Sequence, residues 1–348
     1  MKICMFQHSL LNRGGDKMVI EYANHLQSRG HEVIISANLI KTVFKPEVKI
    51  QAISTLSSKL ATIFSAVFKK RECDILVGTI VVMIFLLSIR NRNKLIYFAQ
   101  DYDEYYYKNP FLKMLVWAAY FYCLKLRKIP VIAVSERLGL LLRKRFNAKV
   151  AIVPNGVDAD FFYPDLDKKY KILKGDSKAI LVFSRSDYRK GFDTAIQVIS
   201  RLNDQVNKGD ISLWAVGEPL HVPFKVRNFG FVPAETLRKI LSCSDVLLYP
   251  SRHEGFGLLV LESMACGCPV VTSEDVPIVD HDETALVCKK DDVAAFADAV
   301  NELLCNDVLK RKIVGKGLKV VKKYSLSASR ISFEQVLLNY HRELSRIL

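Results

Sequence analysis

The sequence predicts an α/β protein that contains two doubly wound, Rossmann-like domains. Short β-rich runs alternate with helix-like segments along almost the whole chain, which is typical of parallel sheets covered by helices on both faces. The 348 residues exceed the roughly 250–300 at which a single core stops growing. A charged stretch with Pro and Gly, residues 161–177, has few apolar runs and separates the two halves.

These observations divide the chain into three parts. We expect an N-terminal domain at residues 1–165, a C-terminal domain at 166–325, and at 326–348 a helix that crosses back onto the N-terminal domain. Two Rossmann-like domains that face each other leave one central cleft, and ligands of such sheets bind beyond the carboxyl ends of the strands. The loops that follow strands are therefore the places to look for a site.

The first half opens with KICMFQ, residues 2–7, a short apolar run that suits a buried strand. Residues 14–31 carry apolar side chains at helical spacing, and Gly30 ends this helix. Further strands are expected at 32–37, 74–79, 94–100 and 130–135, separated by helix-like stretches, and residues 148–158 close the half.

The second half repeats this plan. Strands are expected at 179–185, 211–217, 226–232, 245–251 and 269–273, with helices at 191–202, 234–244, 257–266 and 291–304. The longest apolar stretch of the chain, residues 75–89, is shorter than the ~20 residues that a membrane span needs. Gly78 and Thr79 divide that stretch into a strand-like and a helix-like part.

The cysteine pattern bears on the cellular location of the protein and on whether it binds a structural metal. All eight are scattered, without a Cys-x-x-Cys pair or a Cys/His cluster, which argues against structural zinc. No secretory signal opens the chain. We therefore predict a cytoplasmic protein with reduced thiols and no bound metal.

The positive charge is concentrated in one region. Ten of the residues from Lys108 to Lys149 are Lys or Arg and one, Glu136, is acidic, within a chain of net charge +15. Trp117 and several other aromatic residues lie in the same stretch, a combination that favours contact with an anionic membrane surface at the inner face of the cell membrane. The alternative is a core helix with a basic solvated face. No nucleic-acid module accompanies the charge, so we predict no nucleic-acid partner.

Two acids stand eight positions apart in SRHEGFGLLVLES, residues 251–263. Glu254 follows the strand at 245–251, and Gly255 and Gly257 permit positive φ and close approach of the backbone to a ligand. Glu262 lies about 7–8 Å further along the helix that begins near Gly257, so both carboxylates can reach one ligand. The alternative is a loop charge and an ordinary helix residue, although the apolar neighbours of Glu262 imply that it is buried and needs a partner.

Several stretches of the chain resemble those of a known enzyme family. The Glu254-x7-Glu262 pattern in EGFGLLVLESMACGCPVV resembles the Glu-x7-Glu motif of the retaining glycosyltransferases of family 4, which have the GT-B fold. The resemblance extends over nearly the whole chain. It includes RGGDKMVIEYANHLQSRGHEV at 13–33, VPNGVDADFFYP at 153–164 and SRSDYRKGFDTAI at 184–196.

The resemblance implies roles for particular residues. It places Glu254 beside the donor sugar and Glu262 on the donor ribose, and it assigns Arg185 and Lys190 to the donor diphosphate. Arg189 competes with Lys190 for that role, but Gly191 follows Lys190 as in the family. A solvated basic turn is the alternative. The resemblance further assigns to donor binding the glycine loop, the base-contacting stretch and the turn after Glu254, namely Gly14, Gly15, Phe231, Val232, Gly255, Phe256, Gly257 and Leu258.

The chain departs from the family pattern on the acceptor side. Many members carry a histidine where this chain has Gln100 and Asp101. Asp101 is expected to orient the acceptor hydroxyl or accept its proton, which makes it a fourth catalytic candidate beside Glu254, Arg185 and Lys190. Gln100, Asp101 and Tyr102 are expected to shape an acceptor pocket, the alternative being a surface loop. The glycine-rich turn after the strand at 269–273 is also shortened.

The expected activity is therefore retaining transfer of a sugar from a nucleoside diphosphate sugar to a hydroxyl of a glycan or lipid-linked glycan, in cell-surface polysaccharide synthesis. The sugar nucleotide is a co-substrate, and no cofactor is expected. A cation pair can neutralise the departing diphosphate without a metal. Two alternatives remain: a sugar-nucleotide epimerase or hydrolase of the same architecture, and a non-catalytic binding module.

Overall fold

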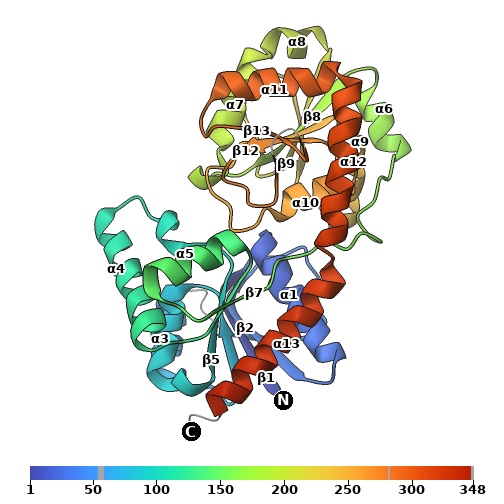
Figure 1. Ribbon diagram of the computed structural model, residues 1–348. Coiled ribbons are helices and arrows are strands. Elements are labelled where there is room, and N and C mark those ends of the chain that lie inside the picture. Colours follow the sequence, from blue (N-terminus) through green and yellow to red (C-terminus); the bar gives the residue numbers. More distant parts are fainter. Residues whose placement is uncertain (54–58, 281–282, 346–348) are drawn as a thin grey trace. The chain divides into compact units, whose positions relative to one another are not determined.

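The computed structural model describes residues 1–53, 59–280 and 283–345, so the end of the predicted C-terminal helix and part of the shortened turn lie outside the described residues. The chain forms two compact units. The first contains Met1–Asn155 together with the segment from Ser327 onward, and the second contains Gly156–Leu326. Each unit is built on one sheet whose strands are all parallel, which confirms the α/β class and the two doubly wound sheets (Figure 1).

The sheet of the first unit has the order β3-β2-β1-β4-β5-β6-β7. Its strands are rich in Val, Ile and Leu because both faces are covered. They are β1 (Lys2–Leu10), β2 (Glu32–Ile40), β3 (Lys49–Ala52), β4 (Ile75–Gly78), β5 (Leu95–Ala99), β6 (Val131–Ala133) and β7 (Val150–Ile152). The strand order reverses between β1 and β4, where a ligand of a doubly wound sheet binds.

One face of this sheet carries α1 (Gly14–Ser28) and α13 (Leu326–Ser345). The rings of Tyr22 on α1 and Phe333 on α13 are stacked 4.1 Å apart, and the Tyr22 hydroxyl lies 2.7 Å from the Ser329 hydroxyl. Glu334 of α13 also meets His25 at 3.0 Å. These buried contacts hold the C-terminal helix on the first unit.

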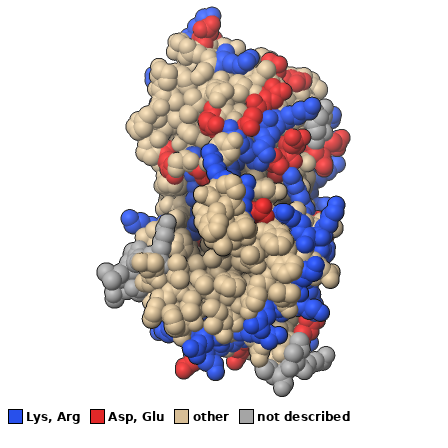
Figure 2. Space-filling view, turned by 90° about the vertical axis from the view of Figure 1, so that its left-hand side faces the viewer, with Lys and Arg blue, Asp and Glu red and all other residues tan. Residues whose placement is uncertain are grey.

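The other face carries α2 (Lys59–Phe68), α3 (Val81–Asn91), α4 (Pro110–Tyr120), the π-helix Phe121–Leu126 and α5 (Glu136–Phe146). Right-handed crossovers that advance from β3 to β7 place all of these helices on one side. In sequence order α2 packs on α3, and α3 on α4. Figure 2 shows a broad area of the first unit on this side with few charged side chains, and Lys and Arg along its borders.

The second unit has the strand order β10-β9-β8-β11-β12-β13. Its strands are β8 (Lys178–Ser184), β9 (Ile211–Gly217), β10 (Val226–Gly230), β11 (Val246–Tyr249), β12 (Val270–Ser273) and β13 (Leu286–Cys288). Its helices are α6 (Lys168–Lys174), α7 (Phe192–Arg201), α8 (Asn203–Lys208), α9 (Ala234–Cys243), α10 (Leu258–Ala265), α11 (Val293–Cys305) and α12 (Asp307–Lys323).

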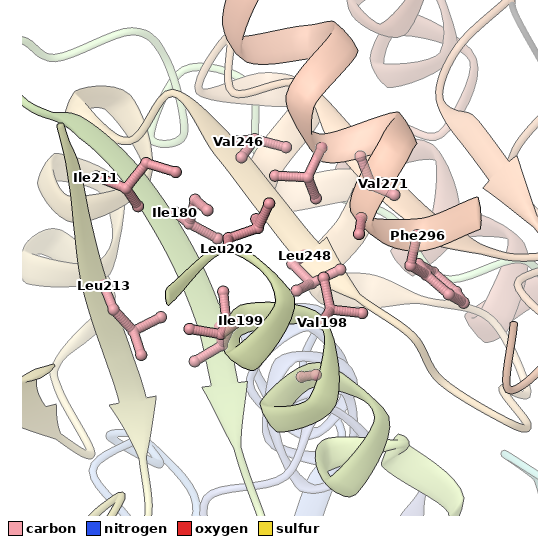
Figure 3. Packing of buried hydrophobic residues seen from close by; sticks show 14 of the residues in the cluster. Ile180, Val198, Ile199, Leu202, Ile211, Leu213, Val246, Leu248, Val271 and Phe296 are labelled. Atoms are coloured by element: carbon pink, nitrogen blue, oxygen red, sulfur yellow. The ribbon is translucent and has the colours of Figure 1, made fainter. Parts of the chain in front are cut away.

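The core of the second unit fills the space between this sheet and α7 and α11. Ile180 and Leu248 extend from the strands toward Val198 on α7 and Phe296 on α11, and all four side chains are buried (Figure 3). The charged stretch at 161–177, which the sequence analysis took as the boundary between the halves, contains α6, and Asp167 caps that helix by accepting from Lys169 N at 2.8 Å. Among the described residues no helix is long and apolar enough to cross a membrane.

Candidate functional site

The carboxyl edge of the second sheet gathers the predicted donor residues. Arg185 follows β8 directly, and Lys190 ends a short 3-10 turn, Tyr188–Lys190, in the same loop. Glu254 lies in the loop after β11, which is the strand next to β8. Because the strand order reverses between β8 and β11, these two loops flank the position where doubly wound sheets bind their ligands.

One carboxylate oxygen of Glu254 is the centre of this arrangement. Its Oε1 atom lies 2.6 Å from Lys190 Nζ, 2.5 Å from the Tyr249 hydroxyl and 3.2 Å from the Ser251 hydroxyl. The Lys190 and Glu254 side chains are largely buried. Charge-assisted hydrogen bonds of this kind are short and hold a carboxylate in one orientation. The structure therefore brings Lys190 and Glu254 into direct contact.

Electrostatics places Arg185 in the same group. Burial raises the pKa of the Tyr249 hydroxyl well above its ordinary value, and the negative charge of Glu254 raises it further. The charges of Arg185 and Arg189 lower that pKa in part, so both guanidinium groups act on the Tyr249 side chain. Arg185 and Glu254 thus both act on Tyr249, and Lys190 contacts Glu254 at the same edge of the sheet.

Lys190 and its neighbour Arg189 contact different acids. Arg189 forms an ion pair with Asp187 in its own loop, with Nη2 at 2.5 Å from Oδ2. Burial alone raises the pKa of Asp187, but the hydrogen bonds and charge of Arg189 outweigh burial and lower it. Arg189 is therefore engaged within the loop, whereas Lys190 extends to Glu254. This supports Lys190 over Arg189 as the second cation of the pair.

Arg252, to which the sequence analysis gave no role, connects the two loops. Its guanidinium pairs with Asp193 at 2.6 Å and with Asp291 at 2.7 Å. The hydrogen bonds that Arg252 donates raise its pKa, and those to Asp193 have the largest effect. Arg252 in turn lowers the pKa of Asp193. Its backbone N–H donates to the carbonyl of Arg189 at 2.7 Å. An arginine directly after a buried strand was the available signal.

The two loops also touch through their backbones at Gly191. Gly191 has φ +62°, in the left-handed region, and a Cβ atom there would lie 1.8 Å from the carbonyl oxygen of Pro250. No side chain fits at that distance, so the glycine is required by both its dihedral angle and its neighbour. This contact fixes the spacing between Lys190 and the strand that leads to Glu254.

The helix that carries Glu262 starts as the sequence predicts. Gly257 precedes α10 with φ +100°, and a Cβ there would lie 2.8 Å from Val276 Cγ1, whereas Gly255 is not in the left-handed region. Of the two glycines that permit positive φ, Gly257 is the one that adopts it. Glu262 is buried at 5% exposure, and its charge contributes to raising the pKa of the nearby Cys266 thiol, after burial. The carboxylate lies inside the unit, as its apolar neighbours imply.

The remaining donor residues differ in what they can offer a ligand. Phe256 and Leu258 are buried, and the Phe256 ring packs edge-on against Tyr324 at 5.4 Å. Their backbone N–H groups, at the start of α10, are the groups that can face a ligand. Phe231 is exposed and Val232 is half-buried after β10, two strands away from β8.

Glu218, another residue that the sequence analysis missed, lies between these positions. It follows β9, the strand between β8 and β10, and its Oε2 atom accepts from the backbone N–H of Ser186 at 2.8 Å. Gly217 before it has φ +119°, and a Cβ there would lie 2.3 Å from the Ser184 carbonyl oxygen. The loops after β8 and β9 are thus joined next to Arg185. The position of Glu218 after a strand was again the available signal.

The first unit brings its own predicted residues together at the carboxyl edge. A Cβ atom on Gly15 would lie 1.8 Å from Gln100 Oε1, so the side chain of Gln100 packs directly on the glycine turn that opens α1 with Gly14. Asp101, also after β5, is 8% exposed, and its Oδ1 atom accepts from Tyr102 N at 2.8 Å. Gln100 and Gly15 are therefore in direct contact, and Asp101 follows Gln100 in the loop after β5.

Tyr102 does not belong to an open pocket. Its side chain is fully buried, and its ring stacks on Tyr120 with centroids 5.0 Å apart. Its hydroxyl lies 2.5 Å from Glu104 Oε2 and 2.7 Å from Arg145 Nη1. Burial, followed by the bond to Glu104, raises its pKa. Tyr102 thus supports the loop from within, because stacking against Tyr120 buries more of its ring than a solvent-facing position does.

Two further findings concern metals and thiols. Across residues 1–53, 59–280 and 283–345 no three His, Cys, Asp or Glu side chains are grouped to hold a metal ion. All eight cysteines are free thiols, and burial raises the pKa of several, for example Cys288 to about 12. The buried cysteines with a raised pKa are packing residues, because thiolates are disfavoured where they lie.

Comparisons with known proteins match both units. Residues 12–161 match the family model described as Glycosyltransferase Family 4, and residues 177–306 match the one described as Glycosyl transferases group 1. An uncharacterized glycosyltransferase of Methanocaldococcus jannaschii is 30% identical over 218 residues, which are 56% of this chain and 56% of that protein. The chain spans about half the length, or less, of the curated relatives that it matches first.

Solved structures share the architecture at low identity. Anabaena HepE in complex with UDP-glucose has 15% identity and a TM-score of 0.78, covering 97% of this chain and 100% of that one. WaaG, a glycosyltransferase involved in lipopolysaccharide biosynthesis, has 16% identity and a TM-score of 0.79, covering 96% and 99%. Since the fold is that of GT-B glycosyltransferases and both units match glycosyltransferase family models, the chain belongs to the glycosyltransferases of the family 4 type.

Proposed function

We propose that the protein transfers a sugar from a nucleoside diphosphate sugar to a hydroxyl of a glycan or lipid-linked glycan, with retention of the anomeric configuration. The observation that carries the proposal is the contact of Lys190 with Glu254, in loops after two neighbouring strands, β8 and β11, where the strand order of the second sheet reverses; Arg185 directly follows β8. Family membership supports it, and so does the likeness to HepE, whose structure contains UDP-glucose.

In this reaction the bond between the anomeric carbon and the donor phosphate breaks, and a bond to the acceptor oxygen forms. Negative charge builds on the departing diphosphate, so fixed cations there stabilise the transition state more than the bound donor. Arg185 and Lys190 supply these cations. Because Lys190 is paired with Glu254 in the described state, the diphosphate competes with Glu254 for its ammonium group. Glu254 is then available to the sugar hydroxyls.

The other site residues position the two substrates. Glu262 accepts hydrogen bonds from the donor ribose, as the acid of a dinucleotide site does. Phe231 or Val232 lies by the nucleobase, and the amides of Gly14, Gly15 and the start of α10 meet the donor. The acceptor proton leaves on the departing phosphate oxygen during front-face attack, with Asp101 orienting the acceptor hydroxyl. No metal ion or cofactor takes part.

The proposed setting is assembly of a cell-surface polysaccharide at the cytoplasmic face of the membrane, on an acceptor that is a glycan or a lipid-linked glycan. The likeness to WaaG, which is involved in lipopolysaccharide biosynthesis, supports this setting. The basic region at 108–149 supplies contact with anionic lipids. Most of its cations, including Lys108, Lys125 and Lys144, are exposed. Anionic headgroups attract such clusters within a Debye length.

Labelled sugar nucleotides with lipid-linked or free glycans test the activity. A glycosidic product with the donor's anomeric configuration, unaffected by EDTA, supports the proposal. Lys190→Ala should lower kcat about 100-fold or more, as removal of one charge-stabilising group typically does, while Lys208→Ala on an exposed helix end should not. An altered free sugar nucleotide would point to an epimerase. Tight donor binding without any product would point to a binding module.

A further inference from the structure

The outer side of three helices in the first unit is apolar. On α2, Leu60, Phe64 and Phe68 are exposed, and Phe64 has 66% of its surface open to solvent. On α4, Phe111, Met114 and Trp117 are exposed in the same way, with Phe111 at 61%. The rings of Phe64 and Phe68 contact each other at 4.5 Å, so their apolar surface is continuous.

These helices form a single layer and lack acids entirely. Their sequences are KLATIFSAVF for α2, VVMIFLLSIRN for α3 and PFLKMLVWAAY for α4, without one Asp or Glu. Since α3 packs between α2 and α4, the exposed side chains of the three lie on neighbouring helices of one face. We call the outer side of α2, α3 and α4 the docking face.

The second unit provides an internal comparison. Its helices α7, α9 and α11 cover a parallel sheet of the same kind, with the sequences FDTAIQVISR, AETLRKILSC and VAAFADAVNELLC. Each carries at least one exposed acid, namely Asp193 on α7, Glu235 on α9 and Asp298 on α11, as a solvated helix does. The fold itself therefore does not require an apolar outer side. An apolar face that spans three helices indicates a binding surface.

We propose that the docking face binds a bilayer that contains anionic lipid, with the aromatic side chains of α2 and α4 inserted at the boundary between headgroups and acyl chains. This deepens the membrane contact of the proposed function and extends it beyond residues 108–149 to α2 and α3. It rests on the proposed function only in placing the acceptor at a membrane. The docking itself can be measured without donor or acceptor.

The charges around the face favour lipid as the occupant. In a doubly wound unit the helices run opposite to the strands, so α2, α3 and the π-helix after α4 all end at one border of the face. Exposed cations gather at these ends: Lys69, Lys70, Arg90, Lys125 and Lys128. Basic residues beside apolar and aromatic ones match the headgroup and acyl regions of an anionic bilayer.

A second copy of the chain fits this face less well. A symmetric dimer places the same patch on both subunits, so the interface would collect the border cations of two copies. With no acid in the three helices, nothing on the docking face itself would offset this repulsion. The face therefore complements anionic headgroups and not itself.

Flotation with vesicles tests the proposal. The full chain is mixed with vesicles of phosphatidylcholine alone or with a quarter phosphatidylglycerol, at 0.1 M and 0.5 M NaCl. We expect binding to the anionic vesicles that persists in part at 0.5 M, because salt screens charges but not apolar insertion. Trp117 reports insertion by a blue shift of its emission, since the other tryptophan, Trp214, is fully buried.

Variants assign the binding to the face. The double substitution Phe64→Ser and Phe68→Ser should weaken vesicle binding about tenfold or more, because two exposed aromatic rings no longer enter the bilayer. Ile172→Ser, which removes an 81% exposed side chain from α6 in the second unit, is the matched control and should bind as the original chain does. An unchanged thermal midpoint for both variants shows that folding is retained.

Three results would overturn the proposal: no binding to anionic vesicles, complete release at 0.5 M NaCl, or equal binding by the double variant. A concentration-dependent dimer that the double variant abolishes would assign the face to a second copy instead. The docking and the transferase activity can fail separately. Vesicle binding without any glycosyl transfer leaves the docking intact, and transfer to a water-soluble acceptor without vesicle binding refutes the docking alone.

Discussion

Replacing Arg252 by lysine tests whether this side chain holds the two loops of the second unit together. The guanidinium is buried and donates five hydrogen bonds. Lysine has three donors at a single point and cannot reproduce the planar fork, so at least two bonds are lost. The acceptors are both carboxylate oxygens of Asp193, one of Asp291, the carbonyl of Tyr188 and the hydroxyl of Thr194.

The magnitude follows from these partners. A hydrogen bond to a charged group contributes roughly 1.5–3 kcal/mol. Asp193 and Asp291 are about half exposed, at 54% and 48%, so water replaces part of what is lost and each bond contributes less than that range, about 1–1.5 kcal/mol. Two lost bonds therefore cost about 2–3 kcal/mol. For a domain of this size that corresponds to a fall in melting temperature of about 4–12 °C.

The assay is calorimetry of the full chain, combined with titration of UDP and GDP. We expect the melting temperature of Arg252→Lys to fall and the affinity for the bound nucleotide to weaken, because the loop that carries Lys190 is no longer fixed to the loop that carries Glu254. Arg311→Lys on the exposed side of α12 is the control and should change stability by less than about 0.5 kcal/mol. If Arg252→Lys melts and binds like this control, the reasoning is refuted.

Three further predictions concern the same features. Gly191→Ala should destabilise the protein by several kcal/mol, because the new Cβ would clash with the Pro250 carbonyl oxygen. The control is Gly209→Ala, at φ +87° with no described atom within 4 Å of the new Cβ, which should cost about 1–2 kcal/mol. Equal urea unfolding midpoints for the two variants would contradict this prediction. Tyr249→Phe should reduce kcat/KM about tenfold by removing a donor from Glu254, and unchanged kinetics would show that the hydroxyl does not orient this carboxylate. Acidification should weaken the attachment of α13 to the first unit. Burial raises the pKa of Glu334, but the hydrogen bonds and charges of His25 and Arg29 outweigh burial and lower it. The stabilisation that Glu334 contributes is therefore complete above about pH 4.5 and is lost as the pH falls through its lowered pKa in the folded protein. Hydrogen exchange of α13 at pH 6 and pH 3.5 checks it, and a Glu334→Gln variant with the same acid response would rule the carboxylate out.

The element pattern could be predicted from the sequence because it depends on local periodicity. The run at 75–89 divides at Gly78 and Thr79 into β4 and α3, as expected, since neither residue continues the apolar pattern. The charged boundary at 161–177 gave no prediction of the helix α6, because this helix depends on the cap at Asp167 more than on apolar spacing. Short helices held by a cap leave a weak signal in composition.

The sequence predicts where the candidate site residues lie, but it does not predict their contacts. Spacing places Arg185, Lys190 and Glu254 after strands, and parallel strands bring such loops to one edge. Spacing does not say which of two adjacent cations pairs with Asp187, because that depends on the turn Tyr188–Lys190.

Tyr102 shows the same limit in the other unit. An aromatic run beside a site suits a sugar pocket and a packed loop equally well. The Tyr102 ring is buried against Tyr120, which favours the packed loop at this residue. Tyr120 lies 18 positions further along the chain, so sequence spacing does not reveal this contact.

The amino-acid sequence alone determined the alternation of strands and helices, the family motif with its two acids, and the basic region of the first unit. These are properties of neighbouring residues, and local periodicity and charge express them directly. Only the tertiary structure decided that Arg252 and Gly191 join the loops after β8 and β11, that Tyr102 is buried, and that three helices without acids lie side by side. Each of these depends on which distant segments meet when the sheets form, and sequence spacing does not encode contacts over such separations.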